Sequence, residues 1–263
     1  MFDTHCHLAF AAFAGRVERI LSDAEAAGVC GAITVSTTSR DCLEGLELAR
    51  GDVRVWCTAG VHPLSANQPR DWSNIKAVAQ DDRCVAWGEL GLDHHYDDPP
   101  ASRQRELLGE QLAFIESCSG PGGVGAMPIV VHCRDAVDDL LGVFGEAGFE
   151  PQRYVFHCFT GTPQEARKVL DFGAWISFTG VVTFKNAREV AEAAKIVPAD
   201  RIMVETDAPY LSPEPVRKMH PNEPRNVVHI ARFLAALRGV DATEFEAQLD
   251  RNAERCFGVD LRP

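Results

Sequence analysis

The sequence has no surplus of positive charge. Its 263 residues contain 26 Lys and Arg against 38 Asp and Glu, which gives a formal net charge of −12. Proteins that coat nucleic acid along a phosphate track need many Lys and Arg contacts, so this composition argues against that class of binding. A nucleic acid held only at its end is still compatible, because bound cations would reverse the local charge.

Apolar runs long enough to cross a bilayer are missing, and no basic segment followed by an apolar run opens the chain. The nine cysteines are odd in number and include no C-x-x-C pair. We therefore expect reduced thiols, a cytoplasmic protein and no membrane partner.

Familiar catalytic signatures are absent as well. The chain has no glycine-rich phosphate loop, no G-x-S-x-G elbow and no dinucleotide fingerprint. Any catalytic chemistry must therefore come from polar residues scattered along the chain.

What the sequence does contain is a series of eight short apolar runs, usually followed by a segment with helical spacing. Most runs are continuously hydrophobic, which is typical of strands buried on both faces of a parallel sheet. They span residues 2–7, 31–36, 53–60, 84–89, 128–132, 154–157, 174–178 and 201–205. Eight such units predict one TIM (β/α)8 barrel domain over residues 1–263, with an open doubly wound sheet as the competing fold.

Two loops of this predicted barrel differ in their expected roles. The glycine-rich segment 117–127 joins a helix to the fifth run, so we expect it on the face away from the chemistry. The proline-rich segment 208–224 follows the eighth run, and we expect it to shape the substrate entrance.

The first apolar run carries two histidines, His5 and His7, at alternate positions. Alternate residues of a strand project to the same side, so this pair makes half of a metal site. Further candidates stand at the ends of later runs: Glu89, His132, His157 and Asp207. In a barrel these ends converge at one mouth, where four imidazoles and two carboxylates suit two divalent cations.

Such a pair of cations predicts a hydrolase. A water bridging them loses its proton near neutral pH, and the ions take up the charge that develops on a phosphoryl or carbonyl oxygen. Glu89 is the expected bridge and Asp207 the expected proton acceptor. Strand alternation turns Cys6, Cys133 and Cys158 away from the ligands, so we expect no role for them as ligands or nucleophiles.

Three nearby residues have open roles. His62 contacts either the substrate or the metal-bound water, or is a loop histidine. Arg134 has the parity of His132 and either holds a phosphate or pairs with a loop acid. Asp93 shares the parity of Glu89 but also suits a cap of the following turn.

Seven short motifs make the sequence resemble the TatD family of metal-dependent deoxyribonucleases, within the amidohydrolase-like barrels. They cover nearly the whole chain in order: FDTHCH at 2–7, AGVHP at 59–63, GELGLD at 88–93, VHCRDA at 131–136, FHCFTG at 156–161, ETDAPYL at 205–211 and NEP at 222–224. Each motif alone is weak, whereas seven at fitting separations are highly specific.

This resemblance implies a barrel in which His5, His7, Glu89 and Asp207 hold one metal, while Glu89, His132 and His157 hold the other. It also implies Mg²⁺-dependent hydrolysis of DNA, commonly from a 3′ end. His62 and Arg134 match family positions near the substrate.

Alternatives to this interpretation remain open. The substrate of the same metal site is either DNA or a small amide, lactone or phosphoester, because related barrels host many hydrolytic reactions. A binding protein with a vestigial metal site is the third hypothesis. The ions are Mg²⁺, Zn²⁺ or Mn²⁺, since imidazole-rich sites accept the latter two while Mg²⁺ prefers oxygen ligands.

Overall fold

The computed structural model describes residues 1–120 and 123–261 of the chain, and in this part eight parallel strands follow one another around a single sheet. The strands are β1 (Phe2–Cys6), β2 (Gly31–Thr34), β3 (Val55–Ala59), β4 (Cys84–Asp93), β5 (Ile129–Arg134), β6 (Tyr154–Phe156), β7 (Trp175–Phe178) and β8 (Ile202–Val204). The ring closes where the ends of β1 and β8 meet, because His7 N donates to Ala208 O at 2.7 Å and Asp207 N donates to His5 O at 2.9 Å. The predicted TIM barrel is confirmed.

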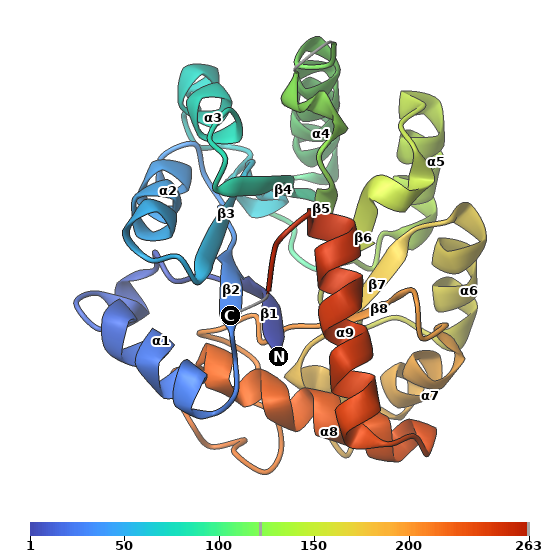
Figure 1. Cartoon of the computed structure of the whole chain (residues 1–263). Coiled ribbons are helices and arrows are strands. Elements are labelled where there is room, and N and C mark those ends of the chain that lie inside the picture. The colour runs from blue at the N-terminus through green and yellow to red at the C-terminus, as the bar shows by residue number, and fades with distance from the viewer. Residues whose placement is uncertain (121–122, 262–263) are drawn as a thin grey trace.

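Helices surround this ring on the outside, and the last of them crosses one end of it (Figure 1). They are α1 (Val17–Ala26), α2 (Asp41–Gly51), α3 (Trp72–Ala79), α4 (Ala101–Ser117), α5 (Val137–Ala147), α6 (Pro163–Phe172), α7 (Arg188–Ile196), α8 (Val227–Arg238) and α9 (Ala242–Phe257). Among the described helices, none combines the length and apolar character needed to cross a membrane.

The start of α6 shows how local sequence sets these boundaries. Thr162 Oγ1 accepts a hydrogen bond from Glu165 N, and Glu165 Oε2 accepts one from Thr162 N, so two backbone donors of the first turn are satisfied. Gly173 ends the helix in the left-handed conformation, at φ 103°.

β4 runs four residues beyond the apolar run that predicts it. Its pairing with β5 continues from Leu90↔Val131 to Asp93↔Arg134. This close approach requires glycine at position 91, where φ is 152° and a Cβ would lie 1.9 Å from His132 O. Glu89 and Asp93 therefore stand on one continuous strand beside His132.

The inside of the barrel changes character along its axis. At the N-terminal end of the strands it is apolar, and Phe2, Trp56 and Trp175 pack there with Ala253 and Phe257 of α9. Helix α9 therefore covers this end of the barrel, in front of the strands in Figure 1. The C-terminal end carries the polar residues described below.

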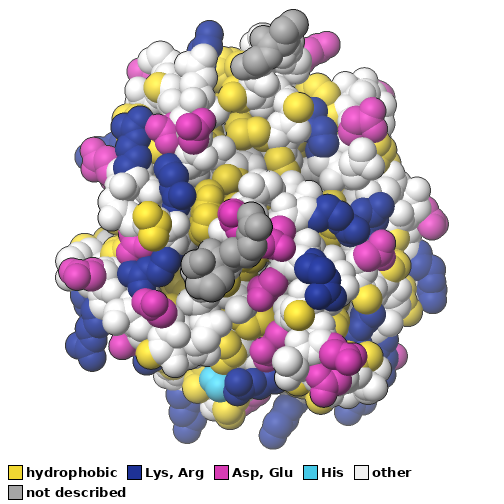
Figure 2. Space-filling view, viewed as in Figure 1, with side chains coloured by type: hydrophobic (Ala, Val, Ile, Leu, Met, Phe, Trp, Pro, Cys, Tyr) yellow, Lys and Arg dark blue, Asp and Glu magenta, His cyan; other side chains and the backbone are white. Residues whose placement is uncertain are grey.

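Figure 2 shows the face that carries α9 and both chain ends. Acidic and basic side chains are interspersed on it, without a broad area of positive charge.

The glycine-rich segment 117–127 is predicted to lie away from the chemistry. Its residues 121–122 are outside the described part of the chain, and so are residues 262–263 at the end of the expected domain. Val124–Ala126 form a short 3-10 helix, and Val124 O accepts a hydrogen bond from the indole of Trp87.

Candidate metal centre

A cavity of about 750 Å³ opens at the C-terminal ends of the strands, within the range of about 300–1,000 Å³ usual for ligand sites. Of the eight candidate site residues, seven line it: His7, His62, Glu89, His132, Arg134, His157 and Asp207. The eighth, His5, is completely buried and reaches the group only through contacts with its neighbours. The structure therefore brings all eight to one place.

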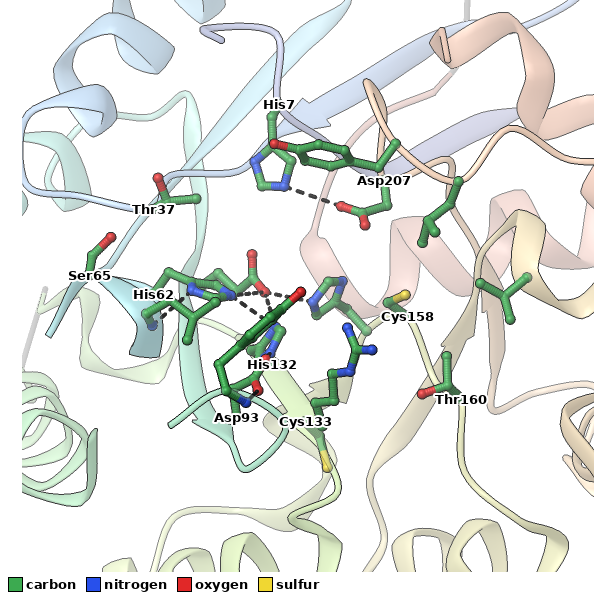
Figure 3. Close-up of a pocket in the computed structure, with 18 of the residues that line it drawn as sticks. His7, Thr37, His62, Ser65, Asp93, His132, Cys133, Cys158, Thr160 and Asp207 are labelled. Atoms are coloured by element: carbon green, nitrogen blue, oxygen red, sulfur yellow. Dashed lines mark hydrogen bonds and ion pairs between the residues drawn. The ribbon is translucent and has the colours of Figure 1, made fainter. Parts of the chain in front are cut away.

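The first set of donors consists of His5, His7 and Asp207. His5 Nε2 lies 3.3 Å from His7 Nε2, and Asp207 Oδ1 lies 3.2 Å from His7 Nε2 and 3.7 Å from His5 Nε2. Figure 3 shows His7 and Asp207 facing each other. The Nδ1 atom of His7 contacts the carbonyl of Val35 at 3.0 Å, so its Nε2 is the nitrogen turned toward the site.

Glu89 stands between this set and the remaining histidines. Its Oε2 lies 3.4 Å from His5 Nε2, whereas its Oε1 lies 2.6 Å from His157 Nε2 and 2.8 Å from His132 Nδ1. The buried His157 Nε2 makes no well-directed hydrogen bond there. Two carboxylate oxygens aimed at two groups of imidazole nitrogens fit a pair of bridged cations.

His132 is held by a second carboxylate. Its Nε2 lies 2.9 Å from Asp93 Oδ2, which leaves Nδ1 facing Glu89. Asp93 Oδ1 also accepts hydrogen bonds from His95 N and Tyr96 N, so Asp93 both orients His132 and caps the turn.

His62 directly contacts the donor cluster. Its Nε2 lies 3.0 Å from His132 Nδ1 and 3.4 Å from Glu89 Oε1. Distance alone groups it with these two residues as a third set of possible ligands. However, its Nδ1 accepts a hydrogen bond from Leu64 N. Neutral His62 therefore carries its proton on Nε2, the nitrogen that faces His132 and Glu89.

Sequence reasoning missed Glu205, a buried carboxylate at the base of the site. Its Oε1 lies 3.3 Å from His157 Nδ1 and accepts a hydrogen bond from Cys158 N, while Oε2 accepts one from Ser177 Oγ. Glu205 is thus a charged neighbour of His157, although His157 Nδ1 makes no well-directed hydrogen bond, unlike His132 Nε2 with Asp93. The sequence did carry a signal for this residue, because Glu205 directly follows the apolar run Ile-Met-Val.

The protonation states follow from burial and from the many close imidazoles. Burial alone would raise the pKa values of Glu89 and Asp207, but the surrounding histidines outweigh it and hold both below their usual range. Burial likewise opposes the charged forms of His7, His132 and His157, yet their carboxylate neighbours raise these pKa values above 6.5. For His62, burial and the nearby His132 lower the pKa to about 3.

The two remaining sequence predictions concern Arg134 and the cysteines. Arg134 lies on the cavity wall, and its guanidinium stands over the ring of Tyr96 and not beside an acid of the described residues. Cys133 also borders the cavity, but its sulfur points away from the cluster in Figure 3, as alternation predicts. The prediction is wrong for Cys158: β6 ends at Phe156, the backbone turns to φ 44°, and Cys158 lines the cavity. Burial still raises the pKa of its thiol well above 9.0, which disfavours a nucleophile.

Comparison with known proteins gives consistent matches over the whole chain. The family model described as TatD related DNase matches residues 2–258. The uncharacterized metal-dependent hydrolase YcfH of Escherichia coli (strain K12) is 35% identical over 263 residues, which cover 99% of this chain and 96% of that relative. The protein named 3′-5′ ssDNA/RNA exonuclease TatD of Erwinia tasmaniensis is 34% identical, with coverage of 98% and 100%.

Among solved structures, YJJV, a TatD homolog from Escherichia coli K12, superposes with a TM-score of 0.88 at 29% identity, covering 99% of this chain and 98% of that one. An organophosphorus hydrolase from Deinococcus radiodurans has a TM-score of 0.64 at 16% identity and is similar in fold alone.

Proposed function

The chain belongs to the TatD related DNase family, whose relatives include metal-dependent hydrolases, and on this premise we propose that it is a deoxyribonuclease. It hydrolyses phosphodiester bonds at DNA ends, as an exonuclease of the 3′ type, in the cytoplasm. The observation that carries the proposal is Glu89, whose two oxygens face separate groups of imidazole nitrogens.

Two divalent cations would be held by these groups. We assign His5, His7, Glu89 and Asp207 to one ion and Glu89, His132 and His157 to the other. Mg²⁺ is the proposed ion, with Zn²⁺ or Mn²⁺ as substitutes that imidazole ligands accept. When bound, such ions lower the pKa of water and neutralise charge on a phosphoryl oxygen.

Residues of the chain accept the proton and bind the substrate. Asp207, with 14% of its side chain exposed against 2% for Glu89, is open enough to accept a proton from water. The oxygen of that water bonds to phosphorus, and the phosphorus–oxygen bond to the leaving group breaks. The leaving oxygen takes up the proton that Asp207 accepted. His62 donates a hydrogen bond from Nε2 to the substrate, and Arg134 binds a phosphate oxygen.

A second candidate function keeps the same centre but cleaves a small amide, lactone or phosphoester. The observation that favours it is charge: Arg134 is the only Lys or Arg among the described residues that line the cavity. A small substrate needs no further phosphate contacts.

The test uses purified protein with DNA of three kinds, namely single-stranded, blunt and 3′-recessed, in Mg²⁺ or Mn²⁺. We expect cleavage that EDTA abolishes, and a Glu89→Gln variant reduced by more than about 100-fold, since losing even a partner of a ligand costs about 10–100-fold. Glu189→Gln changes an exposed residue of α7 and is the control variant. Cleavage that survives EDTA or Glu89→Gln refutes the mechanism, and turnover of a metabolite panel without DNA cleavage supports the small-molecule hydrolase.

A further inference from the structure

Two exposed tyrosines line the cavity that holds the candidate metal centre. Within residues 1–120 and 123–261, five large hydrophobic side chains are exposed, and only Tyr96 and Tyr210, at 50% and 53%, belong to the cavity wall. Aromatic rings left open beside a cavity offer contact area that a bound molecule can cover.

The two tyrosines occupy equivalent places on opposite sides of the barrel. Tyr96 follows Asp93 by three residues, and its N–H donates to Asp93 Oδ1 at 3.2 Å. Tyr210 follows Asp207 by three residues, and its N–H donates to Asp207 O at 2.9 Å. β4 and β8 are four strands apart in a ring of eight, so these turns rise from opposite sides of the mouth.

Each ring is connected to a group that the proposed reaction uses. The guanidinium of Arg134 lies 5.7 Å from the centre of the Tyr96 ring. The Tyr210 ring meets His7 edge to face, with ring centres 6.5 Å apart, and meets Phe10 at 6.4 Å. Phe10 in turn stacks on His7 at 4.5 Å. The exposed rings therefore stand immediately beside a phosphate-binding residue and a candidate metal ligand.

The charge of the cavity limits how a nucleic acid can be held there. With Arg134 as the one Lys or Arg among the described lining residues, a long row of phosphate contacts has no partners. Base stacking on aromatic rings is the other general source of affinity for single strands, and it tolerates any sequence because every base has a π face.

We propose that Tyr96 and Tyr210 are stacking surfaces for the two unpaired nucleobases that flank the phosphodiester cleaved at this centre. The assignment rests on the proposed nuclease function and deepens it, because it makes these tyrosines determinants of substrate choice. Inside a duplex both faces of a base are covered by its neighbours, and at a duplex end one face of the terminal base is still covered. The enzyme therefore prefers unpaired ends, and base sequence has little influence on cleavage.

The experiment compares kinetic constants on two single-stranded oligonucleotides. One carries normal bases throughout, and the other carries abasic residues on both sides of the bond that is cleaved. With normal bases, Tyr96→Leu and Tyr210→Leu each raise KM about 10-fold with kcat nearly unchanged. With the abasic substrate, wild type itself shows a KM raised further, because both stacking contacts are lost, and the two variants add nothing to it.

Further variants separate stacking from a structural role. Tyr96→Phe and Tyr210→Phe keep the rings and return KM to near the wild-type value. Val53→Ala changes an 83% exposed residue just before β3, at the opposite end of the strands, and serves as the control.

Three outcomes overturn the assignment. Unchanged KM in both Leu variants removes the stacking role, and equal losses on normal and abasic substrates show a structural role instead. In either case wild-type cleavage still supports the nuclease. If wild type cleaves neither these oligonucleotides nor blunt or 3′-recessed DNA in Mg²⁺ or Mn²⁺, the proposed function fails and the assignment fails with it.

Discussion

At the residue scale, the candidate centre depends on neighbours that decide which nitrogen each imidazole presents. The Val35 carbonyl contacts Nδ1 of His7, Asp93 contacts Nε2 of His132, and Glu205 lies beside Nδ1 of His157. In each case the other nitrogen faces the shared group of donors. Such partners raise the basicity of a ligand and prevent it from rotating.

Replacing Glu205 by Gln tests this support. The amide keeps the volume of the side chain but loses the charge beside His157, so we expect a loss of about 10–100-fold in Mn²⁺ affinity, measured by calorimetry. Activity should recover in part at high Mn²⁺ concentration. Glu189→Gln, which is exposed on α7, should bind Mn²⁺ like wild type. An affinity equal to that of wild type in Glu205→Gln would show that His157 needs no such partner.

The pH dependence of metal binding follows from the raised pKa values of His7, His132 and His157. A cation binds the neutral imidazole, so below pH 6.5 it must displace protons from all three. Affinity should therefore rise as pH increases from 6.5 through the raised pKa values and then level off. The same shifts stabilise the metal-free protein below pH 6.5, and this contribution is lost as pH rises.

Mn²⁺ titrations and melting of the metal-free protein at several pH values between about 6 and 9 check both trends. A metal affinity that falls with rising pH would contradict the assignment of these histidines as ligands.

At the element scale, the pairing of β4 with β5 holds Glu89 and Asp93 against His132. This pairing depends on Gly91, whose missing side chain lets the two backbones approach. The part of β4 that extends beyond its apolar run is therefore needed to build the site.

We expect Gly91→Ala to reduce both stability and metal affinity. The positive φ alone costs about 1–3 kcal/mol for a side chain, and the clash with His132 O adds to it. Chemical denaturation and Mn²⁺ binding measure the two effects. Gly109→Ala in α4, where no atom would meet the new Cβ, should instead stabilise by about 0.5–1 kcal/mol. Equal stability of the two variants would refute the packing argument.

At the scale of the whole molecule, the two ends of the barrel have separate tasks. The N-terminal end is sealed by apolar side chains and α9, whereas the C-terminal end carries the cavity and its ionisable residues. Stability and chemistry should therefore respond to different substitutions.

Phe257→Ala tests this separation. The ring is 5% exposed and packs into the apolar end of the barrel, so its removal should cost about 3–5 kcal/mol in the free energy of unfolding. Chemical denaturation measures this loss. The folded variant should still bind metal with wild-type stoichiometry, which calorimetry measures. Val53→Ala should change stability by less than about 0.5 kcal/mol. A variant that stays folded yet loses the metal would show that the two ends are coupled.

The sequence by itself determined the barrel, its family and the type of chemistry. Continuous apolar runs at regular intervals are a local property that specifies buried parallel strands, and His, Glu and Asp at their ends are visible without coordinates. The hydrolase family is confirmed by the matches over the whole chain, whereas the division of ligands between two ions stays a prediction.

Only the tertiary structure decided which side chains support the ligands and which nitrogens they present. The contact of Glu205 with His157, the hydrogen bond from Leu64 to His62 and the cavity position of Cys158 arise where strands end and backbones turn. Beyond the last strand residue, alternation no longer applies, because each turn has its own dihedral angles. Contacts between residues dozens of positions apart then depend on packing around the whole ring.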